Sequence, residues 1–292
     1  MKQKLLIFVS VLVLVFGLMI MLYPAVSSLV NMRSQSRVID RYEETVADYP
    51  DQEIERLRKE AEEYNVRLRD SSVIMTDPFD EEAVRITSEA YEETLNVDGV
   101  GMMAFLDIEE IGVHLPVYHG TGETVLARAA GHLQGTSLPV GGKNTHAVLS
   151  AHTGLAEAKL FTDLDELEEG DTFRITVLDE ELTYEIYDIE VVEPEDISSL
   201  KIESGRDLCT LVTCTPYGVN SHRLLVHGER IPFSIEDDED ASWQQSVMFS
   251  PKYLLAGSVF LLIVLLVSFV VIIRRRKIRK RRHELWQSIR RR

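Results

Sequence analysis

The sequence predicts a mainly β domain with helices on its N-terminal side, placed between two membrane-spanning segments. Two long apolar runs, Leu5–Tyr23 and Leu254–Ile273, flank the middle of the 292-residue chain. Between them, short runs rich in β-branched and apolar residues end at Pro or Gly, which is typical of strands. The stretch Arg37–Arg69 instead carries apolar residues at helical spacing.

The first apolar run predicts a membrane anchor. Leu5–Tyr23 follows Lys2 and Lys4 and is long enough to cross a bilayer. It exceeds the apolar core of a signal peptide, roughly 7 to 15 residues, although the Ala-Val-Ser at 25–27 resembles a cleavage site. We expect residues 1–4 to be cytoplasmic and residues 5–23 to be an anchor; a signal segment is the open alternative.

Residues 37–73 predict one or two amphipathic helices. The stretch is dense in Glu, Arg and Ala, and Leu57, Ala61 and Tyr64 recur at helical spacing. Further on, Asp77 followed by Pro78 has the pattern of a helix start, with Asp77 as N-cap and Pro78 as the first helical residue. A helix over Ala83–Leu95 would then follow.

Three short runs predict strands that contain or lead into the candidate catalytic residues. Thr145–Ser150 precedes His152, and Leu208–Thr213 precedes Cys214. After a turn at Pro216 and Gly218, the next strand begins near His222 and contains Arg223. A simple hairpin would place Cys214 and Arg223 at the adjoining ends of neighbouring strands.

The only two cysteines, Cys209 and Cys214, are predicted to stay unbridged. Five residues of strand span roughly 16 Å, whereas the Cα atoms of a disulfide lie within about 7 Å. The odd spacing also puts the two side chains on opposite faces, so Cys209 is expected in the core. Cys214 is the candidate nucleophile.

A thiol needs a base or a positive charge nearby in order to react at neutral pH. His152, at the exit of a strand, is the candidate general acid or base. Arg223 has the permanent charge and the fork of donors that suit a developing oxyanion. From spacing alone, a core thiol, a structural histidine and a surface arginine remain the alternative.

The other histidines predict no metal site. Among them, His114, His119, His132 and His146 show neither HExxH nor paired CxxC spacing. We therefore expect no metal and no cofactor.

The C-terminal part predicts a tether, a second span and a cytoplasmic tail. Residues 234–252 contain the acidic run 236–240 and are expected to be a flexible linker. Residues 254–273 are twenty residues without a charge, which cover about 30 Å as a helix. Residues 274–292 carry eleven basic residues against one acid, which predicts a cytoplasmic tail that contacts anionic lipid. The part between the spans then lies outside the cell.

That middle part has 18 basic residues against 47 acidic ones. Such a balance argues against binding of nucleic acid or other polyanions. It fits basic partners, such as lysine-bearing proteins, and equally an acidic surface that is only solvated.

The run Thr210–Cys214, with its downstream arginine, resembles the signature of sortases, and more closely that of the class C branch that assembles pili. Val117–Thr121, Gly131–Pro139 and Lys159–Leu164 agree with it, and the resemblance covers roughly Ile74 to Pro232. It implies a closed sortase-type β-barrel of about eight strands over residues 83–233. It also implies Cys214 as nucleophile, His152 as general acid or base, and Arg223 as the residue that contacts the substrate carbonyl.

The class C resemblance further implies that residues 74–82 form a lid loop. In that class an Asp-Pro-aromatic motif covers the site, and here Asp77, Pro78 and Phe79 match it. Phe79 would shield Cys214 and Asp77 would pair with Arg223. This role is compatible with a helix start at the same residues.

The implied activity is that of a membrane-anchored transpeptidase of Gram-positive cells. It would cleave an LPxTG-like sorting signal in pilin subunits and join the acyl group to a lysine amine of the next subunit. The alternatives are a housekeeping sortase that anchors surface proteins to the cell wall peptidoglycan, a secreted cysteine protease, and a non-enzymatic surface protein with a buried Cys214.

Overall fold

The computed structural model describes residues 2–70, 75–80, 89–97, 99–155 and 158–232. The predicted acidic linker 234–252, the predicted span 254–273 and the basic tail 274–292 lie outside the described residues.

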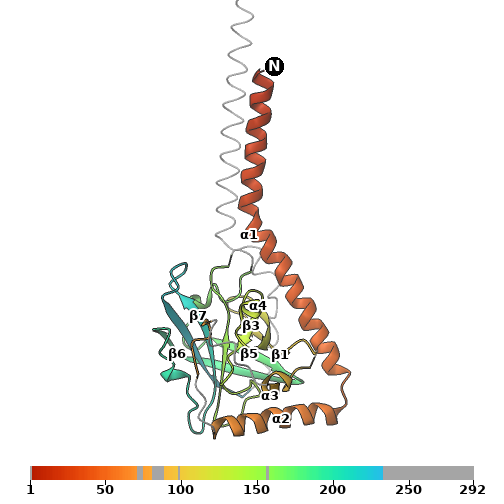
Figure 1. Ribbon diagram of the computed structural model, residues 1–292, viewed down its shortest axis with the longest axis vertical. Coiled ribbons are helices and arrows are strands. Elements are labelled where there is room, and N and C mark those ends of the chain that lie inside the picture. The colour runs from red at the N-terminus through yellow and green to blue at the C-terminus, as the bar shows by residue number, and fades with distance from the viewer. Residues whose placement is uncertain (1, 71–74, 81–88, 98, 156–157, 233–292) are drawn as a thin grey trace, which may run out of the picture. The chain divides into compact units, whose positions relative to one another are not determined.

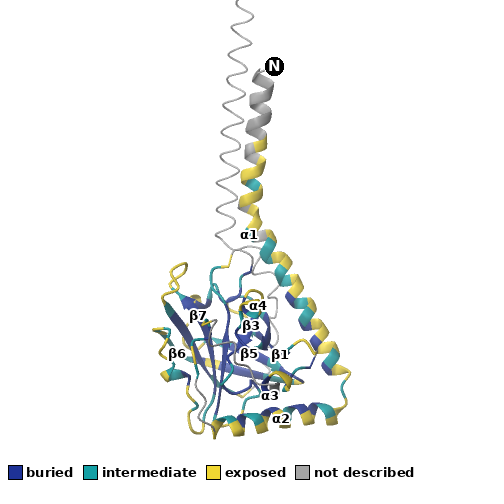
Figure 2. Cartoon of the chain, viewed as in Figure 1, coloured by how far each residue is buried: buried dark blue, intermediate teal, exposed yellow. Residues whose placement is uncertain are grey.

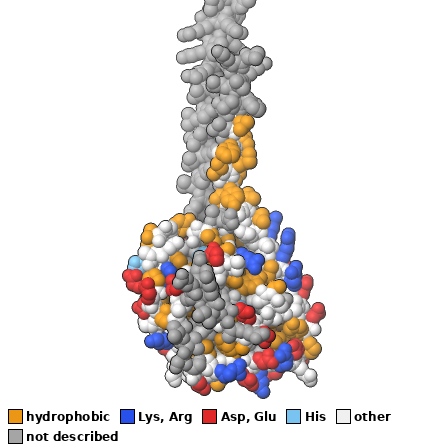
Figure 3. All heavy atoms as spheres, in the orientation of Figure 1, with side chains coloured by type: hydrophobic (Ala, Val, Ile, Leu, Met, Phe, Trp, Pro, Cys, Tyr) orange, Lys and Arg blue, Asp and Glu red, His pale blue; other side chains and the backbone are white. Residues whose placement is uncertain are grey.

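Helix α1 (Lys2–Ala47) is continuous through Pro24, so the predicted anchor and the first part of the predicted amphipathic region form one helix. Among the described residues it is the one helix long and apolar enough to cross a membrane, and it lies near the N-terminus, where a signal sequence would also lie. Its exposed apolar side chains form an orange stretch in Figure 3.

Two N-terminal helices pack on the barrel (Figure 1). The hydroxyl of Tyr42 on α1 donates to the Met103 carbonyl and accepts from the Leu178 N–H, each at 2.9 Å. Helix α2 (Asp51–Arg69) buries one face, and its Asn65 side chain pairs with both the N–H and the carbonyl of Leu138. Figure 2 shows these buried stripes beside the exposed outer faces of both helices.

The eight strands close into a barrel in the order β1-β2-β3-β4-β7-β8-β6-β5, because β1 also pairs with β5. This confirms the predicted mainly β architecture. The β2–β3 and β4–β7 pairs are parallel and the others are antiparallel. The strands are β1 (Met102–Ile108), β2 (Val113–His119), β3 (Ala130–His132), β4 (Thr145–Ser150), β5 (Thr172–Val177), β6 (Glu180–Val192), β7 (Asp207–Thr215) and β8 (His222–Arg230).

Short helices lie in the connections. They are α3 (Glu89–Glu93), α4 (Glu123–Leu126), and the 3-10 helices η2 (Leu164–Glu166) and η3 (Ser198–Leu200). Helix α3 is the described part of the helix predicted over Ala83–Leu95, since residues 81–88 lie outside the described residues.

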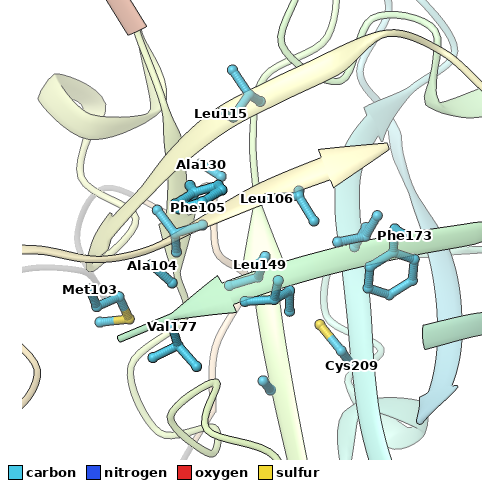
Figure 4. Packing of buried hydrophobic residues seen from close by; sticks show 14 of the residues in the cluster. Met103, Ala104, Phe105, Leu106, Leu115, Ala130, Leu149, Phe173, Val177 and Cys209 are labelled. Atoms are coloured by element: carbon cyan, nitrogen blue, oxygen red, sulfur yellow. The ribbon is translucent and has the colours of Figure 1, made fainter. Parts of the chain in front are cut away.

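The barrel interior is an apolar core that includes Cys209, as predicted (Figure 4). Cys209 and Leu211 of β7 belong to this core, whereas Val212 belongs to a second apolar cluster with Val148 and Leu225. Because side chains alternate along a strand, the even-numbered residues of β7 face this second cluster. Cys214 is on the same face as Val212, and both cysteines are free.

Candidate active site

The parallel β4–β7 pair brings His152 and Cys214 to one end of the barrel wall. Each residue of β4 faces the residue of β7 that is 62 positions later, from Thr145 opposite Asp207 to Ser150 opposite Val212. His152 and Cys214 continue this register beyond the end of β4. Parallel strands end at the same edge of a sheet, so the imidazole and the thiol start from neighbouring backbone positions.

Two hydrogen bonds fasten the segment that carries His152 to the strand that carries Cys214. The Ala151 N–H donates to the Val212 carbonyl at 3.2 Å, and the buried Thr213 hydroxyl donates to the Ala151 carbonyl at 2.7 Å. Because Ala151 precedes His152 and Thr213 precedes Cys214, these bonds hold the backbones of His152 and Cys214 side by side. No local pattern in the sequence predicted the hydrogen bond from the Thr213 hydroxyl to the Ala151 carbonyl.

Cys214 and Arg223 face each other across the antiparallel β7–β8 hairpin, as the sequence predicted. Cys214 is 7% exposed and Arg223 is 9% exposed. The Arg223 guanidinium donates from Nη1 to the carbonyls of Asn220 and His222. These bonds leave Nε and Nη2 for a partner outside the hairpin.

That partner is Asp77. Arg223 donates from Nε to Asp77 Oδ1 at 2.9 Å and from Nη2 to Oδ2 at 2.5 Å, a bidentate pair in which both side chains are largely buried. Asp77 Oδ1 also accepts the Phe79 N–H at 3.3 Å, and Pro78 and Phe79 form a turn. Asp77 therefore caps a turn while it pairs with the arginine; the residues that would continue a helix from this point, 81–88, lie outside the described residues.

Phe79 contacts both His152 and Arg223. Its ring centroid is 5.5 Å from that of His152, and the guanidinium carbon of Arg223 lies 5.1 Å from the ring centre on the Phe79 face. Phe79 and Met75 also pack on the second apolar cluster of the barrel wall. Residues 75–80 thus lie against the His152 imidazole and the Arg223 guanidinium, at the edge of the barrel where Cys214 also lies.

Burial raises the pKa of the Cys214 thiol above its ordinary value. The Arg223 charge opposes this rise and the Asp77 carboxylate adds to it. In this arrangement the thiol is therefore protonated at neutral pH, and the cation that could activate it is already engaged by Asp77.

Glu123 is a site contact that sequence reasoning missed. Its Oε2 lies 3.3 Å from Nε2 of His152, and Glu123 is the first residue of the short helix α4. The two residues are 29 positions apart, and no motif in the sequence links them.

The histidines considered above for a metal have other partners. His114 pairs with Asp107, and His119 contacts the carbonyls of Gly101 and Thr94. Burial lowers the pKa of His132 and of His146 to about 4, so both are neutral. Over the described ranges, no group of three His, Cys, Asp or Glu side chains is arranged to hold a metal ion.

Comparison with known proteins shows which family this chain resembles. A family model described as a sortase domain matches residues 106–231. Sortase A of Streptococcus agalactiae is 32% identical over 143 residues, which are 48% of this chain and 56% of that protein. The chain therefore spans little more than half the length of this curated relative.

Solved structures match over a larger share. Sortase C of Streptococcus pneumoniae is 42% identical with a TM-score of 0.62, covering 68% of this chain and 97% of that chain. Sortase C-1 of Actinomyces oris is 48% identical with a TM-score of 0.57, and the match covers 62% of this chain and 99% of that chain. With the closed barrel and the grouping of Cys214, His152 and Arg223, these matches place the chain in the sortase family, with sortases C among its structural relatives.

Proposed function

We propose that this chain is a cysteine transpeptidase that cleaves an LPxTG-like sorting signal and joins pilin subunits, with Cys214, His152 and Arg223 as its catalytic residues. The observation that carries the proposal is the grouping of these three side chains at one edge of the barrel. The β4–β7 register aligns His152 with Cys214, and the β7–β8 register places Arg223 opposite the thiol.

The first half of the reaction forms a thioester. The sulfur of Cys214 attacks the carbonyl carbon of the threonine in the sorting signal, and Arg223 stabilises the oxyanion that develops. The C–N bond to the following glycine then breaks, and His152 gives a proton to the departing amine. The C-terminal part of the signal leaves, and the threonine acyl group stays on Cys214.

The second half transfers that acyl group. A lysine amine of another subunit attacks the thioester carbonyl, and His152 accepts the proton that the amine loses. The C–S bond breaks, the thiolate of Cys214 is restored, and an isopeptide bond joins the two subunits. A lysine acceptor suits an enzyme whose middle part is strongly acidic.

The segment 75–80 acts as a lid in this proposal. Asp77 occupies the two donor positions of Arg223 that an oxyanion would need, and Phe79 lies against the imidazole. The segment must move before substrate binds. The closed arrangement keeps the thiol protonated and protected until then.

Pilin as the substrate class is supported by the relatives. The sortase C of Streptococcus pneumoniae is described with a pilin substrate specificity, and that of Group B Streptococcus is pilus-related. The matches to Sortase A favour, as a second candidate, the anchoring of surface proteins to peptidoglycan. A cysteine protease that uses water as acceptor would share Cys214 but would produce no joined product.

The proposed location is the cell membrane, with the barrel outside the cell. Helix α1 supports an anchor by its length and its exposed apolar side chains. The span at 254–273 and a cytoplasmic basic tail that contacts anionic lipid belong to the same proposal and rest on the sequence alone.

Incubation of the full-length chain with a purified pilin tests this function. The expected product is a ladder of covalent polymers that resists boiling in detergent, together with a trapped thioester on Cys214. Cys214→Ala should give neither. Polymers from that variant, or hydrolysed pilin without joined product from the native chain, would contradict the proposal.

A further inference from the structure

His152 has one orienting partner that does not belong to the 75–80 segment. Its Nε2 lies 3.3 Å from Glu123 Oε2, while Nδ1 makes no hydrogen bond within the part of the chain that the structure describes. An ionised carboxylate can only accept a hydrogen bond, so Nε2 must be the donor in this contact. In the neutral imidazole, Nδ1 is then the nitrogen with a free lone pair.

The backbone that presents Glu123 is held on two sides. The side chain of Gln35 on α1 donates to the Arg128 carbonyl just after α4 at 2.8 Å, and Leu126 of α4 is buried in the core. Next to it, a Cβ atom on Gly131 would lie 2.3 Å from the Gly120 carbonyl oxygen, so the chain before α4 and strand β3 are in direct backbone contact. Glu123 therefore projects from a fixed point, although its own side chain is 65% exposed.

The contact between Glu123 and His152 does not depend on the lid. When residues 75–80 move away, Arg223 loses Asp77 and His152 loses the ring of Phe79. Helix α4 lies in the connection from β2 to β3 and is held by the Gln35–Arg128 bond and the buried Leu126, so the carboxylate stays beside the imidazole. His152 needs a partner most in that open state, because substrate is then bound.

We infer that Glu123 is a positioning residue for His152: it accepts the Nε2–H bond and thereby makes Nδ1 the nitrogen that exchanges protons with the thiol and the leaving amine. This inference rests on the proposed function of His152. In each half-reaction one proton moves on or off Nδ1, and the proton on Nε2 stays in its bond to Glu123.

The first test is the turnover of a fluorogenic peptide that carries Leu-Pro-Glu-Thr-Gly by the full-length chain in detergent micelles. We expect Glu123→Ala to lower kcat by roughly two- to fivefold with unchanged KM, since exposed charge pairs contribute little energy. Glu123→Gln keeps an accepting oxygen and should restore kcat to near the native value. Glu169→Ala, which removes an exposed carboxylate from the loop before β5, is the control and should leave kcat unchanged.

Native kcat in Glu123→Ala, a change in KM alone, or equal losses in the Ala and Gln variants would overturn the inference. Failure of the proposed function looks different: the native chain would not cleave the peptide, or Cys214→Ala would still cleave it.

The second test measures the ring tautomer of His152 without substrate. It uses nitrogen NMR of the full chain labelled in histidine, with the His152 signals assigned by comparison with His152→Ala. A neutral ring protonated at Nε2, shifting toward a tautomer mixture in Glu123→Ala, supports the inference. A ring protonated at Nδ1 in the native chain refutes it.

Discussion

Asp77 binds Arg223 through both carboxylate oxygens, although 146 residues separate them in the sequence. The pair joins the segment before the barrel to the last strand of the barrel, β8. It is largely buried, and it lies beside a thiol whose pKa it affects from both sides: the guanidinium lowers that pKa and the carboxylate raises it. Removing one partner therefore changes both the exposure and the ionisation of Cys214.

Asp77→Asn should speed alkylation of Cys214 by a small reagent such as iodoacetamide. The variant removes the negative charge that raises the pKa of the thiol and leaves the positive charge that lowers it, so a larger fraction of thiolate forms at pH 7.5. We expect an increase of roughly threefold or more in the second-order rate constant, since one pKa unit changes the thiolate fraction about tenfold. Asp165→Asn, which changes an exposed carboxylate on the 3-10 helix η2, is the charge-matched control. Equal rates in native chain and Asp77→Asn would rule out electrostatic control of the thiol by Asp77.

Phe79→Ala separates shielding from charge. The variant keeps the Asp77–Arg223 pair but removes the ring that contacts His152 and Arg223. Alkylation should accelerate through greater access to the site, with a rate constant that rises more for a bulky maleimide than for iodoacetamide. Met75→Ala is the matched control, because Met75 packs on the same apolar cluster but has no aromatic ring. If both variants accelerate alkylation equally, general loosening of the segment explains the effect and specific shielding by Phe79 does not.

Local patterns in the sequence predicted the parts of the site that local structure creates. The strand Thr145–Ser150 has the predicted bounds, and the short connection between β7 and β8 was enough to place Arg223 opposite Cys214. The opposite faces of Cys209 and Cys214 followed from strand alternation alone.

The parts of the site that depend on distant contacts could not be derived from the residues. The β4–β7 register, which aligns His152 with Cys214, joins segments 62 residues apart, and parallel pairing leaves no turn signal. The Glu123–His152 contact depends on the position at which α4 packs against β3, which the local sequence does not specify. The barrel closure and the pairing of Asp77 with Arg223 came from the family resemblance, because neither composition nor periodicity specifies which strand edges meet.

Asn65→Ala should destabilise the chain by about 2 kcal/mol or more. The amide of Asn65 satisfies both the N–H and the carbonyl of Leu138 at a buried position, at 2.7 and 3.0 Å. Its removal leaves two buried backbone groups without partners, and each costs about 1–3 kcal/mol. Urea unfolding followed by circular dichroism measures the loss, and Glu62→Ala on the exposed side of α2 should stay within about 0.5 kcal/mol of native. An Asn65→Ala variant as stable as the native chain would mean that water replaces the amide at no cost.

Gly131→Ala should destabilise the barrel between α4 and β3. A Cβ atom there would lie 2.3 Å from the Gly120 carbonyl oxygen and 3.0 Å from Leu126 Cδ2. The nearest atom is backbone, so relief requires β3 to shift, and overpacking of this kind costs about 1–3 kcal/mol. Thr124→Ala, an exposed change on the adjacent helix, serves as the control. Thermal unfolding that is equal in the two variants would show that β3 yields without strain.

Acid should destabilise the chain through His132 and His146, which are buried and neutral. Burial lowers the pKa of His132 and of His146 from 6.5 to about 4 in the folded state. Between these values the unfolded chain binds more protons than the folded chain, so stability is complete above pH 6.5 and falls as the pH decreases toward 4. Each histidine contributes up to about 3 kcal/mol over this window, at 1.36 kcal/mol per pKa unit.

Buried carboxylates act in the opposite direction, so a difference measurement is needed. Burial raises the pKa of Asp207, which makes the folded chain gain stability from that group as the pH falls. His132→Gln removes only the histidine contribution, because Asp207 is unchanged. We expect the variant to be less stable than the native chain at pH 7.5 but to lose less stability between pH 6.5 and 4.5, as measured by urea midpoints at several pH values. Parallel pH curves for native and His132→Gln chains would show that His132 titrates in the fold as it does in the unfolded chain.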